Sequence, residues 1–328
     1  MTLWTYRILS TEEKQQEYGE KLNNCWQLPL IYKDWQMNRR KKTMQNVNVK
    51  LRADQSVKKV DNSEDWKLRL ARIGRTCTNT QELADQNPDD FVKKLYNMEH
   101  TSVFEHDTVL LSKEQYIDLM VKIEYAELQA LLKARMISEY AFEEFPVKAS
   151  WFILAKYPYE EFEKLNHNAS TLHTFEITTC RATSHQFVRH RNLSFTERSL
   201  RYFNPAKSEF EFQSPWLTKK TINAEDYVAF HDLCKASAEA YCKLHENNNS
   251  DTARKVLPLA FSTKLVVSGS LYWWLDFLKK RYDAAASIEM IDICQKLCKA
   301  DDNLARVAGK INQEQLKKAG DKLEKFLS

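Results

Sequence analysis

The chain has 328 residues, of which 43% are hydrophobic and 29% are charged, and its formal net charge is only +4. It is long enough to bury one large core or two small ones, and the small charge excess does not by itself imply a nucleic acid partner. No run of about 18 apolar residues occurs, so no membrane-spanning helix is expected. The five glycines form neither a G-x-G-x-x-G loop nor a Walker loop, so side chains and helix ends must hold any phosphate.

Residues 1–60 are expected to form an N-terminal extension. The first residues, MTLWTYRILSTEEKQQ, lack the apolar core of a signal peptide, which favours a cytoplasmic protein. Seven cysteines at scattered spacings predict free thiols in a reducing compartment. The basic stretch NRRKKTMQNVNVKLR at 38–52 is interpreted as a solvated segment, with a nucleic acid contact as the alternative.

Helices and strands alternate along the first half of the chain. Apolar spacing predicts helices over 63–77 and 87–100, and a strand over 106–112. Ser112 and Gln115 have the spacing of a capping box, which predicts one or two helices that continue to Pro146. Imperfect alternation over 170–179 predicts a strand.

The second half is mostly helical. An amphipathic helix is predicted over 222–246, with Tyr227, Phe230, Cys234, Ala238 and Tyr241 facing inward. Further helices are predicted within 269–300 and over 312–328. Many helices with few strands indicate an α+β fold, and no internal repeat is present.

The stretch RHRNLSFTERSLRYF at 189–203 concentrates arginines and hydroxyls between apolar residues. Arginine forks bind phosphate or carboxylate, and hydroxyls donate to the same oxygens. An extended backbone would place Ser199 and Arg201 on one side, and a helical lead-in would place Gln186 and Arg189 on one face. An anion site is favoured over a helix whose arginines pair with acidic neighbours.

A second cluster, EHTSVFEH at 99–106, contains His100 and His106. The spacing of its histidines and carboxylates does not fit the common zinc motifs. One structural histidine and one site histidine are therefore expected, and no metal site is expected.

These clusters, in their order along the chain, resemble the flavin-dependent thymidylate synthases. The family signature R-H-R-x-x-S-x-N-x-x-S-x-R-Y is matched from Arg189 to Tyr202, except that Thr196 stands where the signature has asparagine. EHTSVFEH resembles the family element G-H-x-S-x-x-E-H. CRATSHQF at 180–187, ARKVLP at 253–258 and FLKKRYD at 277–283 resemble three further elements.

The resemblance implies an α+β fold in which helices flank an antiparallel sheet, assembled as a homotetramer with shared active sites. It implies a methyltransferase that converts the pyrimidine deoxynucleotide monophosphate dUMP to dTMP. Methylenetetrahydrofolate would supply the carbon, and FAD reduced by NADPH would carry the hydride. No membrane or nucleic acid partner is expected.

The resemblance also assigns site residues. Arg281 would face the pyrimidine and stabilise the negative charge that develops on it, and His100 would lie near the reacting ring. The nucleotide would be bound by Arg281 together with Gln186, Arg189, Glu197, Ser199, Arg201 and Arg254. The flavin would be contacted by Ser102, Arg189, His190, Arg191, Ser194, Glu197 and Asp276.

The chain departs from the family pattern on the flavin side. Ser270, Leu271 and Tyr272 replace the usual Asn-Ala-Arg, Asp276 replaces a neutral residue or histidine, and Ala285, Ala286 and Ser287 replace His-Ala-Gln. Residues 61–328 are expected to form the family domain. A helical insertion at about 113–171 interrupts what the family has as a short connection between two strands.

Three hypotheses follow from this pattern. The first is an FAD-dependent methylase of dUMP with an altered flavin pocket. The second is a related methylase or hydroxymethylase of another pyrimidine nucleotide such as dCMP, because the Asp276 carboxylate could accept a hydrogen bond from the cytosine amine. The third is a non-catalytic nucleotide- or RNA-binding relative.

Overall fold

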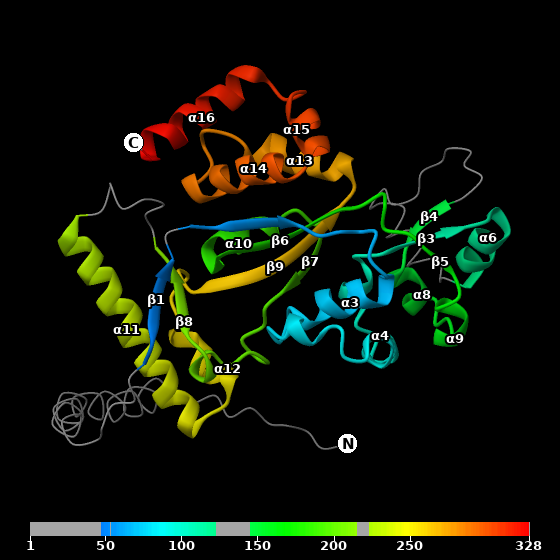
Figure 1. Ribbon diagram of the computed structural model, residues 1–328, viewed down its shortest axis with the longest axis horizontal. Helices are drawn as coiled ribbons and strands as arrows, with labels where there is room; N and C mark the ends of the chain where they lie inside the picture. Colours follow the sequence, from blue (N-terminus) through cyan, green and yellow to red (C-terminus); the bar gives the residue numbers. More distant parts are fainter. Residues whose placement is uncertain (1–46, 53, 123–144, 215–222, 328) are drawn as a thin grey trace, which may run out of the picture. The chain divides into compact units, whose positions relative to one another are not determined.

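The computed structural model describes residues 47–52, 54–122, 145–214 and 223–327 (Figure 1). The chain divides into two units, 1–47 and 48–328, and all but one of the described residues belong to the second unit. Most of the basic stretch predicted at 38–52 lies outside the described residues. None of the described helices is both long and apolar enough to cross a membrane.

A four-stranded antiparallel sheet forms the centre of the unit, in the order β2 (Ser56–Lys59), β6 (His173–Cys180), β9 (Ser262–Gly269) and β7 (Ser194–Glu197). Strands β6 and β9 pair along their whole length, from His173 opposite Gly269 to Cys180 opposite Ser262. The strand predicted over 170–179 is therefore confirmed. Strands β2 and β7 occupy the two edges.

One face of this sheet is apolar because alternate side chains of a strand point to the same side. Phe175, Ile177, Leu265 and Val267 are fully buried there. Helices α10 (Arg181–Phe187), α13 (Leu271–Arg281), α14 (Ile288–Ala300) and α15 (Asp302–Ala308) contribute the other side of this core (Figure 1). Helix α16 (Gln313–Leu327) packs against α14.

The opposite face is more polar and carries a second core. Thr174, Thr196 and Ser268 are buried on this face, while Val266 joins the core built by α3 (Trp66–Arg75), α4 (Pro88–Asn97) and α5 (Thr101–Phe104). The helices predicted over 63–77 and 87–100 are confirmed. Two cores on opposite faces leave the central sheet covered on both sides.

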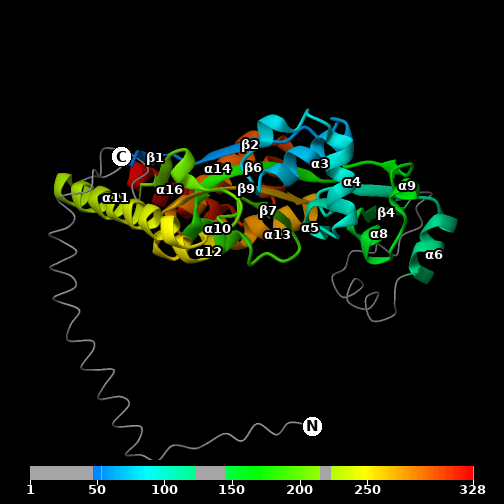
Figure 2. The same ribbon diagram turned by 90° about the horizontal axis from the view of Figure 1, so that it is seen from below.

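The predicted insertion is not purely helical. Strand β3 (Thr108–Leu111) pairs with β4 (Phe145–Lys148) and β5 (Asn166–His167) in a three-stranded antiparallel sheet. Helices α6 (Lys113–Lys122), α8 (Ser150–Leu154) and α9 (Tyr159–Phe162) accompany it, and Figure 2 shows these elements together at one end of the unit. Because Trp151, Phe152 and Phe162 are buried in the core with α3, the insertion is part of this domain.

The capping box predicted at the start of α6 is confirmed. The Ser112 N–H donates to Gln115 Oε1 at 2.9 Å, and the Gln115 N–H donates to Ser112 Oγ at 3.3 Å.

Residues near the predicted domain boundary also differ from the expectation. Strand β1 (Val49–Arg52) pairs in parallel with β8 (Phe210–Gln213), and β2 joins the central sheet. The compact unit therefore begins at Asn48, and the end of the expected extension provides two of its strands.

The long helix predicted over 222–246 is confirmed as α11 (Ala224–Asn247). Cys234, Ala238 and Tyr241 are fully buried, but Tyr227 is 40% exposed. The inward position predicted for Tyr227 is wrong, because the burial of α11 begins farther along the helix. Helix α12 (Ser250–Ala253) and a 3-10 turn, Arg254–Val256, follow.

A buried ionic cluster joins α3 to the insertion. Asp107 accepts from Arg69 Nη2 at 2.5 Å and lies 2.6 Å from His167 Nδ1, and all three side chains are at most 2% exposed. The His167 ring stacks on Trp66 with 3.7 Å between centroids. A buried ionic cluster of this kind is costly to break, because each remaining charge then lacks a partner.

Replacing Asp107 with asparagine should lower the free energy of unfolding by about 3–5 kcal/mol, because it leaves the Arg69 guanidinium buried without a counter-charge. Urea unfolding at neutral pH measures this loss. Glu160→Gln is the matched control: it removes the exposed ion pair with Lys93, where solvent screens the charges, and should leave the midpoint close to that of the wild type. Equal effects of the two substitutions would contradict a special role for Asp107.

Candidate active site

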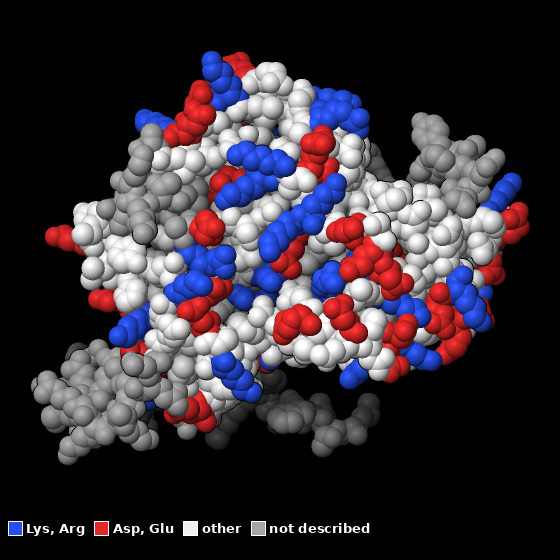
Figure 3. Space-filling model, in the orientation of Figure 1, with Lys and Arg blue, Asp and Glu red and all other residues white. Residues whose placement is uncertain are grey.

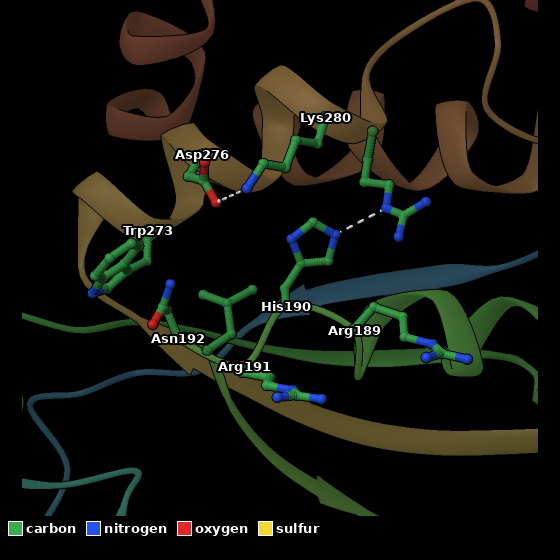
Figure 4. A pocket seen from close by; sticks show the side chains of 9 residues that line it. Arg189, His190, Arg191, Asn192, Trp273, Asp276 and Lys280 are labelled. Carbon is green, nitrogen blue, oxygen red and sulfur yellow. Dashed lines mark hydrogen bonds and ion pairs between the residues drawn. The ribbon is translucent and has the colours of Figure 1, made fainter. Parts of the chain in front are cut away.

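Two pockets contain most of the residues that the sequence assigns to the site. The first pocket is lined by Arg189, His190, Arg191, Asn192, Leu193, Trp273, Asp276, Lys280 and Arg281. It lies between the loop that follows α10 and the side of α13, as Figure 4 shows. Five of the predicted site residues therefore converge here from two distant segments of the chain.

Arg281 is fixed at two points in the first pocket. Its Nε–H donates to His190 Nε2 at 2.9 Å, and its Nη2 donates to the Gln186 carbonyl at 3.2 Å. Gln186 thus contacts the predicted catalytic arginine through its backbone. The Asp276 carboxylate accepts from Lys280 at 2.7 Å.

Aromatic packing brings α10 and α13 together. Phe187 at the end of α10 stacks on Phe277 of α13, with 4.9 Å between centroids. The His190 ring meets the same Phe277 edge-on at 4.8 Å. Because α10 ends at Phe187, Arg189 lies in the following loop, and the prediction that Gln186 and Arg189 share a helix face is wrong.

His190 is neutral at physiological pH. Burial lowers the pKa of His190 to about 4, and the nearby Arg281 and Lys280 charges add to this effect, while Asp276 opposes it. The positive charge of the first pocket therefore comes from arginine and lysine side chains.

The donor set of the first pocket fits a phosphate-bearing aromatic cofactor such as FAD. Arg189 and Arg191 are exposed, and within the described part of the chain neither guanidinium has a hydrogen-bond or ion-pair partner. Unpaired guanidiniums bind phosphate oxygens through two N–H groups at once. Trp273 adds an aromatic surface at the edge of the same pocket (Figure 4).

The second pocket is lined by Arg181, His185, Ser199, Leu200, Arg254, Lys255, Leu257, Pro258, Leu259 and Phe261. Asp251 lies 2.7 Å from Arg254 Nη2 and 3.5 Å from Arg201 Nε, so one carboxylate holds both arginines near this pocket. Three predicted nucleotide-binding residues, Ser199, Arg201 and Arg254, are thereby brought together.

Ser199 and Arg201 lie in a turn, so the predicted extended backbone is wrong at this point. The Tyr202 N–H donates to the Ser199 carbonyl at 3.1 Å, and Ser199 Oγ accepts from the Arg201 N–H at 3.3 Å. The turn is attached to the end of α3 because the Ser199 N–H donates to the Cys77 carbonyl at 2.9 Å.

Glu197 is engaged within the protein beside the second pocket. Its Oε1 accepts from Arg181 Nη1 at 2.9 Å and from Thr263 Oγ1 at 2.8 Å. Glu197 therefore orients Arg181, a pocket residue that the sequence reading did not single out.

The EHTSVFEH segment separates its two histidines as expected. His100 and Ser102 are exposed at the start of α5, and neither lines the two pockets. His106 is fully buried, and its ring nitrogens lie 2.7 Å from Ser268 Oγ and 3.1 Å from Thr196 Oγ1. The prediction of one structural histidine is confirmed for His106. Thr196, the one departure from the signature, bonds to it.

Ser194 is buried and accepts from Lys148 Nζ at 2.8 Å. Lys148 also lies 3.8 Å from Glu105, and burial lowers the pKa of its ammonium group. An insertion residue thus contacts the signature strand. The sequence reading missed Lys148, and no motif in the insertion marks it.

Other pocket residues were missed for lack of a sequence signal of their own. Lys280 and Trp273 lie within the span 269–300 that is predicted to be helical, and Asp251 lies outside the quoted motifs. Among these missed residues, Arg181 is the one whose contact, with Glu197, joins two motifs quoted from the sequence.

Acidic side chains lie between the basic ones on the face of the unit shown in Figure 3. This distribution agrees with the small net charge of +4. The two pockets therefore lie in a surface on which positive and negative side chains alternate. The protein has an α+β fold with an antiparallel central sheet.

The comparisons with known proteins bear on the same segments. Residues 169–302 match the family model described as Thymidylate synthase complementing protein. The flavin-dependent thymidylate synthase of Thermococcus onnurineus is 36% identical over 128 residues, which are 38% of this chain and 51% of that protein. The enzyme of that name from Corynebacterium glutamicum is 29% identical over 141 residues, 39% of this chain and 56% of the relative.

A viral relative gives a similar match. The probable flavin-dependent thymidylate synthase of Paramecium bursaria Chlorella virus 1 is 30% identical over 135 residues, 37% of this chain and 61% of that protein. The chain thus spans about half to three fifths of the length of these curated relatives. The resemblance drawn from the motifs is confirmed for this part of the chain, which holds both pockets.

His106→Phe should destabilise the protein and flatten its pH dependence. Burial lowers the pKa of folded His106 to about 3, below its ordinary 6.5. The unfolded chain therefore takes up a proton below about pH 6.5 that the folded chain refuses, and stability falls toward acid by up to about 1.4 kcal/mol per pH unit. Phenylalanine removes the contribution of His106 to this slope, while that of His190 remains. It also leaves the Thr196 hydroxyl without the imidazole, at about 1–3 kcal/mol for an unsatisfied buried group, whereas Ser268 Oγ keeps Thr174 Oγ1 at 2.8 Å.

Urea unfolding between pH 7 and pH 5 measures both effects. His231→Phe, at a partly exposed position on α11, should keep the slope of the wild type. A slope in His106→Phe as steep as that of the wild type would show that His106 does not contribute to it.

Proposed function

We propose that the protein is a flavin-dependent methylase that converts dUMP to dTMP, with methylenetetrahydrofolate as the carbon source and NADPH as the reductant. One observation carries the proposal: Arg281, Arg189, His190 and Arg191 converge in one pocket although about 90 residues separate them in the sequence. The motifs that resemble the family therefore meet in space. A chance match of short motifs gives no reason for this convergence.

In this proposal Arg281 stabilises the negative charge that develops on the pyrimidine during methyl transfer. A guanidinium that is already held in place stabilises developing charge without a cost of reorientation. The contacts of Arg281 with His190 and Gln186 provide such a fixed position. FAD, when bound, would supply the hydride, and Arg189 and Arg191 would hold its phosphates.

Ser199, Arg201 and Arg254 would bind the phosphate of the nucleotide. Ser199 and Arg254 line the second pocket and Arg201 is linked to Arg254 through Asp251, whereas Arg281 lines the first pocket. This division supports a complete site that is formed by more than one copy of the chain, as in a homotetramer with shared active sites. The antiparallel central sheet with helices on both faces supports a fold of the flavin-dependent thymidylate synthase type.

A second candidate substrate is dCMP, and one observation favours it. Asp276 lines the same pocket as Arg281, and only its Oδ2 is bonded to Lys280. Its other oxygen could accept from the exocyclic amine of cytosine. The third hypothesis, a non-catalytic binding protein, predicts neither a bound flavin nor turnover.

Tritium release from C5-labelled dUMP and dCMP, with methylenetetrahydrofolate, FAD and NADPH present, tests the proposal. Release from dUMP with formation of dTMP is expected, and a flavin absorbance band that NADPH bleaches should accompany it. Release from dCMP alone would show that dCMP, and not dUMP, is the substrate. Asp276→Asn should then abolish the preference for dCMP over dUMP. If neither nucleotide releases tritium and the purified protein contains no flavin, the proposal that the protein is this enzyme is refuted.

Arg281→Ala should lower kcat by about 10²–10³, the usual loss when one stabilising donor is removed. Arg306→Ala is the matched control, because Arg306 is exposed on α15 and bonds only to Asn303 among the described residues. Full turnover by Arg281→Ala would contradict the role given to Arg281.

A further inference from the structure

We propose that His190 is a positioning residue: its imidazole, kept in the tautomer with a proton on Nδ1, holds Arg281 in the orientation that faces the substrate. The resemblance assigns His190 only a contact with the flavin. The catalytic consequence rests on the proposed function, whereas the tautomer and the contact with Arg281 do not.

The tautomer follows from hydrogen-bond chemistry. The Arg281 Nε–H points to His190 Nε2 at 2.9 Å, and a guanidinium can donate but cannot accept. His190 Nε2 must therefore be the acceptor, with its lone pair directed at Arg281. The single proton of the neutral ring then lies on Nδ1.

The same contact selects one orientation of Arg281. An arginine side chain has several rotatable bonds, and two separate contacts are needed to fix both the position and the plane of its guanidinium. His190 Nε2 binds the Nε side and the Gln186 carbonyl binds Nη2, at 3.2 Å. Because both acceptors belong to α10 and its following loop, the remaining N–H groups stay available to a ligand.

The acceptor itself is held by the hydrophobic core. The His190 ring lies edge-on to Phe277, with an interplanar angle of 67°, and Phe277 stacks on the buried Phe187. Phe277 and Arg281 are four residues apart on α13 and so lie on one side of that helix. The helix that carries the arginine therefore also orients the imidazole that holds it.

The surrounding charges oppose protonation of this ring. Arg281 and Lys280 face it from α13, Asp276 on the same helix opposes them in part, and Arg189 and Arg191 flank it in its own loop. A second proton would occupy the lone pair of Nε2 and place two cations against each other. Protonated His190 therefore cannot hold Arg281, and the contact is present only with the neutral ring.

Nitrogen NMR of the ¹⁵N-histidine-labelled full chain tests the tautomer directly, without substrate or turnover. His190, assigned by its absence in His190→Gln, should show a protonated Nδ1 and an unprotonated Nε2 at pH 7. In Arg281→Met the guanidinium that donates to His190 Nε2 is lost, so the tautomer preference should weaken and the pKa of His190 should rise toward its ordinary value of about 6.5. A proton on Nε2 in the wild type, or no change in Arg281→Met, would overturn the proposal.

Two substitutions of His190 test the consequence for turnover. Glutamine can place a carbonyl oxygen near the position of Nε2, whereas phenylalanine keeps the ring shape without an acceptor. His190→Phe should lower kcat about 10²-fold, as misplacement of a catalytic group does, and His190→Gln should recover most of that loss. His231→Phe on α11 controls for the loss of a histidine elsewhere.

The outcomes separate the two proposals. Equal losses in His190→Phe and His190→Gln would overturn the positioning role while leaving the proposed reaction in place. If the wild type shows no turnover, the proposed function fails. The tautomer and its dependence on Arg281 then still decide whether His190 positions the arginine.

Discussion

The pairing of β6 with β9 over eight residues determines where the site residues lie. Each strand leads directly into a helix that folds back over the same face of the sheet: β6 into α10, and β9 into α13. Because the strands are antiparallel, these helices start at opposite ends of the ladder. They meet where Phe187 stacks on Phe277, and the first pocket forms beside this contact.

The two faces of that ladder serve different purposes. The apolar face supports the helices that carry His190 and Arg281. The polar face buries His106 between Ser268 and Thr196. It is covered by the core that α3 and α5 share with β3 and β4. Hydroxyl groups are well suited to this interior position, since each can rotate to donate or accept and so satisfy a neutral imidazole.

Much of the fold and the composition of the site could be predicted from local patterns. Apolar spacing located α3, α4 and α11, and the reciprocal bonds of Ser112 and Gln115 agree with their spacing. The arginine-rich signature also predicted an anion site. These features depend on residues within a few positions of each other, where periodicity and hydrogen-bonding chemistry are read directly from the sequence.

The errors have a common physical origin in tertiary contacts. Ser199 and Arg201 form a turn because the strand ends and the chain bonds to Cys77 near the end of α3. Tyr227 is exposed because, among the described residues, it is the later part of α11 that is buried against neighbouring elements. The insertion forms strands because β3 offers both of its edges to distant segments. Lys148 reaches Ser194 only through the fold, and so does Asp251 its second arginine, Arg201, so the sequence near them does not indicate these contacts.

The bond between Lys148 and Ser194 has a consequence for how the family pattern can vary in this chain. The buried Lys148 ammonium group lies between the Ser194 hydroxyl and the Glu105 carboxylate, and an apolar replacement of Ser194 would remove the closer of these two oxygens. The choice of residue at Ser194 therefore depends on Lys148 of the inserted segment as well as on any ligand. A transplant of the insertion into a shorter relative would have to preserve this pair, since the segment is not a detachable module.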